Sequence, residues 1–238
     1  MRKLLLFLLV LGLAVFVAVP YFILPTVLEN LVARDVQDRL GLAERPGVEL
    51  DSDPQWKMLA GEFSRGKISV GETDLGGVGA ESVAMDLDPF SVDVGESARS
   101  RTAVVEEPIS GRVRLAVSEG EVSRLARENA DVPINGVELR GGGVTINSEA
   151  TVLGATFPVE VDGDVGVEGN ELVFQPGTVR AAGATVPEYL AESLLAGTAF
   201  RYPVEGLPYG ATITDARTTE GAVVLTGNVS GIELGRGG

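Results

Sequence analysis

Short runs of alternating apolar and polar residues are the feature that most restricts what this chain can fold into. When every second residue is apolar, the apolar side chains of an extended segment all lie on one face of a β-strand. Such runs are found at residues 63–70, 83–87, 113–117, 144–146, 157–161, 165–167, 172–174, 200–204 and 223–226. Turn-forming pairs lie between them, including Asp162-Gly163, Gly169-Asn170 and Pro176-Gly177, and such pairs connect antiparallel strands. The sequence therefore predicts an α+β fold, mostly antiparallel sheet with a few helices.

Residues 27–40 have the spacing of an amphipathic helix. Apolar side chains recur every one to four positions, at Val27, Leu28, Leu31, Val32, Val36 and Leu40. Gly41 is a suitable stop for this helix, and residues 41–47 are expected to form a short linker. The helix either continues a preceding membrane helix past Pro25 or docks on the β domain.

Three shorter helices are predicted within the β pattern. The first, Pro54–Ala60, follows a Ser-Asp pair that is a suitable N-cap, with proline in the first turn. The second begins at Ser118, whose spacing to Glu121 matches a capping box. The third covers Pro187–Ala196 and is expected to end at Gly197.

The N-terminus carries a 21-residue run, Leu4 to Leu24, that contains no charged side chain. A hydrocarbon core about 30 Å thick needs roughly 20 apolar residues of helix to cross it, so this run is long enough to be a transmembrane anchor. A cleaved signal peptide is the alternative, but its apolar core is usually about 7–15 residues and ends at a small-x-small site. The best candidate for such a site, Phe16-Val17-Ala18, has a large aromatic residue where a small one is needed. We therefore favour a retained anchor.

Basic residues set the expected orientation of this anchor. Arg2 and Lys3 precede the run and the next basic residue is Arg34, which keeps the N-terminus in the cytoplasm. The sequence thus predicts a cytoplasmic end at residues 1–3, a single-pass anchor at 4–24, a juxtamembrane helix and linker at 25–46, and an extracytoplasmic domain at 47–238.

Composition excludes several classes of function. The chain has no cysteine and no histidine, which removes disulfides, cysteine nucleophiles, Ser-His-Asp triads and the usual zinc sites. Its net charge of −15 repels nucleic acid and anionic headgroups. No cofactor, metal or nucleic-acid partner is expected.

Three short motifs suggest chemistry but have simpler explanations. Ser64-Arg65-Gly66-Lys67 has the S-x-x-K spacing of penicillin-recognising enzymes, but it lies in a predicted strand and lacks their companion motifs. The acidic residues of Asp162–Glu168 are too few for a calcium loop and fit the polar face of a hairpin better. Asp86 and Asp88 share one face of a predicted strand. In an acidic protein such carboxylates usually lie on the solvent face, and this explains the pair without catalysis. We therefore expect no enzyme.

Apolar and aromatic side chains are the remaining candidates for a binding site. Two clusters are predicted to line an apolar groove for acyl chains, made of Trp56, Met58, Leu59 and Phe63 in one and Tyr189, Leu190, Leu194, Phe200 and Tyr202 in the other. Pockets for apolar ligands are built from such side chains with few polar groups. Ordinary core packing of helices on a sheet is the alternative.

The order of these elements resembles the LmeA-like phospholipid-binding family over about residues 27–234. The matching stretches are Pro54–Gly61 running into Phe63–Val70, Gly111–Leu115 leading to the capped helix, and Pro203–Ile213 before the last strands. The resemblance implies a long, curved antiparallel sheet wrapping a few amphipathic helices, similar to tubular lipid-binding folds. It also implies phospholipid or another acyl-chain lipid as partner, and it supplies no catalytic motif.

These observations favour a membrane-anchored, extracytoplasmic lipid-binding protein that shields or shuttles acyl chains. A structural or scaffold protein of the cell envelope, with a fully packed interior and a protein partner, is the alternative. A hydrolase that uses carboxylates alone, such as Asp86 and Asp88, is a third class.

Overall fold

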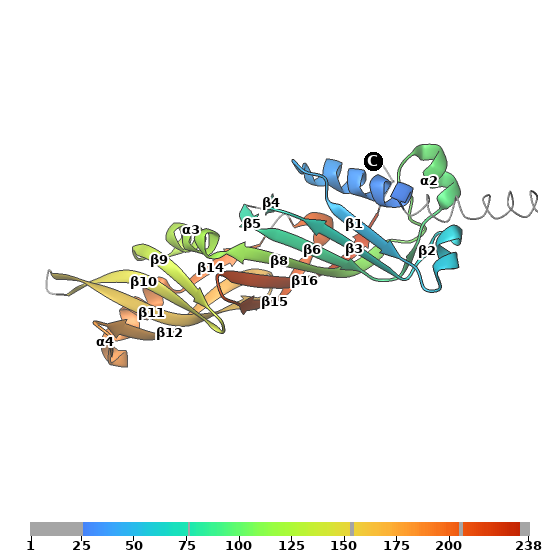
Figure 1. Cartoon of the computed structure of the whole chain (residues 1–238). Helices are drawn as coiled ribbons and strands as arrows, with labels where there is room; N and C mark the ends of the chain where they lie inside the picture. Colours follow the sequence, from blue (N-terminus) through green and yellow to red (C-terminus); the bar gives the residue numbers. More distant parts are fainter. Residues whose placement is uncertain (1–25, 76, 153–154, 205–206, 234–238) are drawn as a thin grey trace, which may run out of the picture. The chain divides into compact units, whose positions relative to one another are not determined.

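The computed structural model of this chain describes residues 26–75, 77–152, 155–204 and 207–233 (Figure 1). The chain forms two compact units. Unit 1 contains the residues up to Val70, Met85–Gly111 and those from Ser230 onward, and unit 2 contains Gly71–Ala84 and Arg112–Val229. The predicted anchor, residues 4–24, lies outside the described residues, and none of the described helices combines the length and apolar character needed to span a bilayer.

The predicted α+β class with antiparallel strands is confirmed, but the strands are divided between several sheets. One six-stranded sheet has the order β1-β3-β6-β8-β16-β15, and its strands β6 (Ser82–Leu87), β8 (Ile109–Ser118) and β16 (Ala222–Ile232) pass from one unit into the other. A second has the order β13-β12-β11-β10-β9, with β14 also paired to β12. Two small sheets, β2-β7 and β4-β5, complete the set in the described residues.

Unit 1 is built around the pair β1–β3, with short helices beside it. Its elements are the helix of residues 26–40, β1 (Gly47–Asp51), the 3-10 helix η1 (Gln55–Ala60), β2 (Glu62–Phe63), β3 (Arg65–Val70), β7 (Phe90–Ser91) and α2 (Val94–Ser100). The helix of residues 26–40 confirms the amphipathic prediction, since Leu28, Val32 and Val36 are buried. Glu29 accepts a hydrogen bond from the Leu50 amide, so this helix docks on β1.

In unit 1 one predicted helix needs correction and one helix was missed. Residues 55–60 form a 3-10 helix without a side-chain cap, because the Ser52 hydroxyl donates to the Glu62 carbonyl instead of capping the helix. Helix α2 was not predicted, although its N-cap is ordinary: the Asp93 carboxylate accepts from the Glu96 amide at 2.7 Å. An Asp followed three residues later by Glu is the signal that could have revealed it.

Unit 2 contains the longest hairpins and two helices. Its elements are β4 (Thr73–Leu75), β5 (Val78–Ala80), α3 (Glu119–Asn129), β9 (Ile134–Arg140), β10 (Gly143–Val152), β11 (Ala155–Glu168), β12 (Glu171–Ala181), β13 (Ala184–Thr185), α4 (Glu188–Thr198), β14 (Phe200–Pro203), η2 (Pro208–Gly210) and β15 (Thr212–Thr218). The predicted helix near the C-terminus is confirmed as α4. It continues through Gly197 to Thr198. The glycine allows close packing there, since a Cβ on Gly197 would lie 2.6 Å from Cγ1 of Val132.

Two of the predicted turns are irregularities inside long strands. Asp162-Gly163 lies within β11 and Pro176-Gly177 within β12, where the register between the two strands shifts by one residue. Only Gly169-Asn170 forms the turn of this hairpin. Glycine and proline mark both turns and β-bulges, so the sequence pattern did not separate the two.

Candidate functional site

One face of the β9–β14 sheet consists almost entirely of apolar side chains in the described residues. Residues that lie directly opposite each other in antiparallel strands share a face, so the registers identify its members. They are Ile134, Val137, Leu139, Val144, Ile146, Val159, Val161, Val165, Leu172, Phe174, Val179 and Phe200, all buried. Ser148 is a buried polar member, and its hydroxyl donates to the Pro133 carbonyl at 2.7 Å. We call this surface the apolar face.

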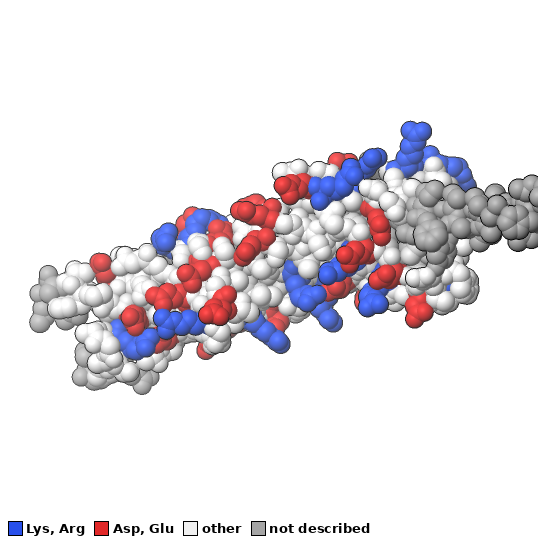
Figure 2. All heavy atoms as spheres, in the orientation of Figure 1, with Lys and Arg blue, Asp and Glu red and all other residues white. Residues whose placement is uncertain are grey.

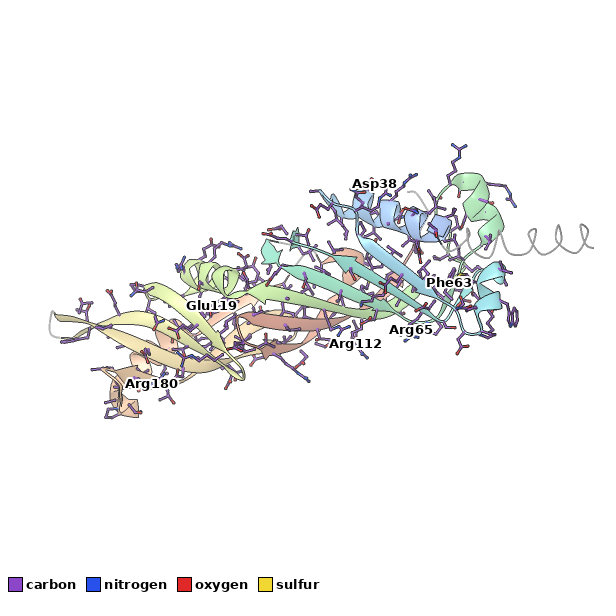
Figure 3. All side chains as sticks on the ribbon, in the orientation of Figure 1. Asp38, Phe63, Arg65, Arg112, Glu119 and Arg180 are labelled. Carbon is purple, nitrogen blue, oxygen red and sulfur yellow. The ribbon has the colours of Figure 1, made fainter. Side chains whose placement is uncertain are left out.

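Helix α3 closes the apolar face. It contacts both β9 and β14, which lie at opposite sides of the sheet (Figure 1). Along the free edge of β9, Ser123 accepts from the Val137 amide at 3.1 Å and Glu119 accepts from the Leu139 amide at 2.8 Å (Figure 3). Because one helix touches both sides, the sheet must curve around α3, whose Leu125 is buried inside.

The start of α3 confirms half of the predicted capping box. The Ser118 hydroxyl accepts from the Glu121 amide at 3.4 Å. The Glu121 carboxylate does not turn back to Ser118; it accepts from the Gly79 amide at 2.7 Å and pairs with Arg124. The hydrogen bond from Arg124 is the main cause that lowers the pKa of Glu121. Glu121 thus ties α3 to β5 as an anion.

Two phenylalanines form the centre of the apolar face. Phe174 and Phe200 are cross-strand neighbours, with ring centroids 5.8 Å apart and planes 20° from parallel. Phe174 also lies over Gly163, where an added Cβ would be 2.7 Å from the Cζ of the ring. Glycine is therefore needed at this bulge, because any side chain there would displace the ring.

A cavity of about 430 to 460 Å³ is present in each unit, and the one in unit 2 adjoins these phenylalanines. Its volume is about 460 Å³, and it is lined by Asn129, Glu168, Val173, Phe174, Gln175, Pro176, Ala199, Phe200 and Arg201. It lies where the partners of β12 change, since β14 pairs with Glu171–Phe174 and β13 pairs with Arg180 and Ala181. Residues 175–178 of β12 therefore have β11 as their only partner among the described strands.

The charged side chains at the rim of this cavity form ion pairs with each other. Arg201 contacts Glu168 at 2.7 Å and Glu171 at 3.3 Å, and these contacts, with Glu168 first, raise the pKa of Arg201. One cation between two carboxylates leaves this rim net negative. A phosphate group that enters must compete with two carboxylates for the guanidinium, whereas an acyl chain meets no such competition.

The cavity of unit 1 has a volume of about 430 Å³ and a more polar lining. Its floor is the stacked pair Phe63 and Phe90, with ring centroids 5.2 Å apart. Lys57, Glu62, Glu106 and Glu107 line the rest together with Ser64, Pro89, Ser91 and Pro108. Four charged side chains make this cavity a poorer site for an acyl chain than the cavity of unit 2.

The predicted cluster near Trp56 lies in unit 1, and its members differ in exposure. Trp56 is 62% exposed and Leu59 is 41% exposed, because η1 buries none of its side chains. Met58 is half-buried, while Phe63 is buried and lines the cavity of unit 1. That this cluster binds lipid stays a prediction.

The second predicted cluster lies in unit 2. Phe200 lines the cavity, and Tyr202 follows it on the apolar face, opposite Leu172 and half-buried. Tyr189, Leu190 and Leu194 belong to α4, but their side chains lie outside the described residues. The two clusters belong to different units, and a shared groove between them stays a prediction.

Sequence reasoning missed the β12 residues of the cavity, Val173, Phe174 and Pro176. The available signal was the run Leu172-Val173-Phe174, three apolar residues in succession. Such a run breaks the alternation of a half-buried strand and indicates burial on both faces, and all three side chains are buried.

The serine motif and the acidic motif considered as chemical sites both lie in or beside β-strands. The Ser64 hydroxyl accepts from the Asp53 amide beside β3, so this serine does not open a helix. Asp162 lies within β11, paired with Arg180 at 2.9 Å (Figure 3) and accepting from Thr145. Among the described residues no group of three acidic side chains is arranged to hold a metal ion.

The fold and the cavity define a class: an α+β protein whose antiparallel sheet curves around a helix and carries a cavity lined in part by aromatic side chains. A family model described as LmeA-like phospholipid-binding matches residues 19–228, and the chain belongs to this family. The resemblance seen in the sequence is thus confirmed. No curated protein and no solved structure matches the chain.

Proposed function

We propose that this protein is a membrane-anchored, extracytoplasmic phospholipid-binding protein of the cell envelope that holds acyl chains in the cavity of unit 2. The observation that carries the proposal is the combination of a phospholipid-binding family with a cavity whose lining includes Phe174 and Phe200 of the apolar face. Its floor of Phe174 and Phe200 offers hydrophobic contact without an unpaired cation.

The sequence supports the anchor and the location. Residues 4–24 are uncharged and long enough to cross a bilayer, and Arg2 and Lys3 before this run favour a cytoplasmic N-terminal end. A surface with net charge −15 is not drawn to anionic headgroups. The anchor keeps the domain beside the membrane, to which its charge does not attract it. We therefore propose that the tethered domain shuttles lipid.

The composition of the chain and the lining of the cavity of unit 2 fit a role without catalysis. The chain lacks histidine and cysteine, and the acidic side chain at the cavity of unit 2, Glu168, is paired with Arg201. To shield acyl chains from water and to carry them, the protein needs neither a nucleophile nor a general base.

A scaffold function is the second candidate, and one observation favours it. Ile146 and Val161, in the middle of the apolar face, are both 0% exposed, as expected of a packed core. A scaffold would bind a protein partner and would carry no lipid.

The lipid content of the purified protein separates these functions. The full-length chain, extracted in a non-phospholipid detergent and washed, should release phospholipid into an organic extract analysed by mass spectrometry. A chain that is free of lipid, and that also fails to bind a labelled phospholipid added back to it, would rule out the proposed function and favour the scaffold.

A further inference from the structure

The hairpin of β10 and β11 ends in a stretch without charge. No charged side chain occurs from Ala150 to Val159, between Glu149 and Glu160. Since 22% of the chain is charged, a segment of ten residues carries about two charges on average. In Figure 2 the surface at this end of unit 2 is correspondingly almost free of red and blue.

The arms of this hairpin extend beyond the neighbouring strands (Figure 1). The pairing of β10 with β9 ends at Ser148, and the pairing of β11 with β12 ends at Val159. The pairs from Glu149–Pro158 to Val152–Ala155 join only the two arms to each other. Residues 149–152 and 155–158, which we call the hairpin arms, therefore stand clear of the rest of the sheet.

The apolar face continues onto the hairpin arms. Phe157 lies opposite Ala150 and two residues before Val159, on the same face as Val161 and Phe174. Phe157 is 51% exposed, whereas Val159 is 4% exposed, so the apolar face emerges into solvent here. From Phe157 to Val165, the partner of Phe174, the strand spans about 26 Å. One leaflet of a bilayer contributes only about 15 Å of hydrocarbon, so this path is long enough for an acyl chain.

The chemistry of the hairpin arms fits a lipid surface. On the opposite face, Thr151 and Thr156 hydrogen-bond each other at 3.2 Å, which reduces the cost of moving them out of water. The net charge of −15 of the whole chain opposes its approach to an anionic bilayer. Residues 150–159 carry no charged side chain, so this stretch adds nothing to that repulsion. The outer edges of a two-stranded hairpin still carry unpaired backbone groups, which restricts insertion to the interfacial layer.

We propose that the hairpin arms of β10 and β11 insert shallowly into a phospholipid bilayer, and that the apolar face leads acyl chains from Phe157 to the cavity at Phe174 and Phe200. The docking is carried by the protruding arms, whose one charged residue is Glu149 at their base. The part played in lipid entry rests on the proposed function.

A unique label on the arms tests the docking. Because the chain contains no cysteine, the substitution Thr156→Cys gives a single site for an environment-sensitive fluorophore, and Thr156 is exposed on the face opposite Phe157. The full-length chain is reconstituted into phosphatidylcholine vesicles that contain lipids with a doxyl quencher. Docking predicts a blue-shifted and quenched label at position 156, and an unquenched label at Thr212→Cys, an exposed position on β15 of the same unit.

The substitution Phe157→Asp, made in the labelled chain, should weaken the docking on the order of tenfold or more, because it puts a charge where an exposed phenyl ring would enter the bilayer. Thr212→Asp adds the same charge elsewhere and should leave the quenching unchanged. Equal quenching at positions 156 and 212 overturns the proposal. Phospholipid that stays on the same labelled chain after detergent extraction and washing separates the two ideas: retained lipid without quenching in vesicles rejects only the docking, and quenching without retained lipid rejects only the proposed function.

Discussion

Replacement of Phe174 by alanine is expected to lower the free energy of unfolding by about 3–5 kcal/mol, the usual cost of removing a large aromatic ring from a core. The ring is 1% exposed, stacks on Phe200 and lies over Gly163. Its removal takes contacts from two neighbouring strands, β11 and β14, and enlarges the cavity. The measurement is urea unfolding of the full-length chain in mild detergent, followed by circular dichroism.

Phe157→Ala is the matched control, because Phe157 is the same residue type on the same face of the same sheet. At 51% exposed, it should cost about 1 kcal/mol or less. Equal losses of unfolding free energy for the two variants would mean that Phe174 does not lie at the packed centre of the apolar face.

The second large effect concerns occupancy of the cavity. Ala199 is exposed and lines the cavity of unit 2 beside Phe200, so Ala199→Trp places an indole where an acyl chain is expected. We expect affinity for a labelled phospholipid to fall by more than about tenfold, equivalent to a loss of about 1.4 kcal/mol of binding free energy. The folded structure should tolerate the change, since the side chain enters existing space.

Ala184→Trp controls for the added aromatic surface. Ala184 is exposed on β13 of the same unit and does not line the cavity, so its substitution should leave lipid affinity unchanged. Retained affinity in Ala199→Trp, with circular dichroism unchanged, would place the lipid outside this cavity.

The strands and most helices were predictable because their signals are local. Alternation identified many of the strands, such as β3, β6, β8 and β16, but not β1, β9 or β15. The spacing of Ser118 to Glu121 identified the start of α3. Bulges were mistaken for turns at Gly163 and Gly177, because the same residue types favour both. The outcome at such positions depends on which strand lies opposite, and that is a long-range property.

The candidate site was predictable only in part, for a similar reason. Phe200 was identified as an aromatic side chain near a helix end, and it lines the cavity. Phe174 was missed because its importance comes from its cross-strand partner and from Gly163 beneath it. Trp56 was selected as an aromatic residue, but its 62% exposure depends on a 3-10 helix that turns its side chains to solvent.

The central claim is that a phospholipid acyl chain occupies the cavity of unit 2, and photo-crosslinking tests it most directly. A phospholipid with a photoactivatable group in its acyl chain is bound to the full-length protein, irradiated, and the adducts are located by mass spectrometry of peptides. We predict adducts at residues 173–176 of β12 and at residues 199–201, at the end of α4 and the start of β14. Adducts confined to residues 57–64, 89–91 and 106–108 of unit 1, or no adducts at all, would contradict it.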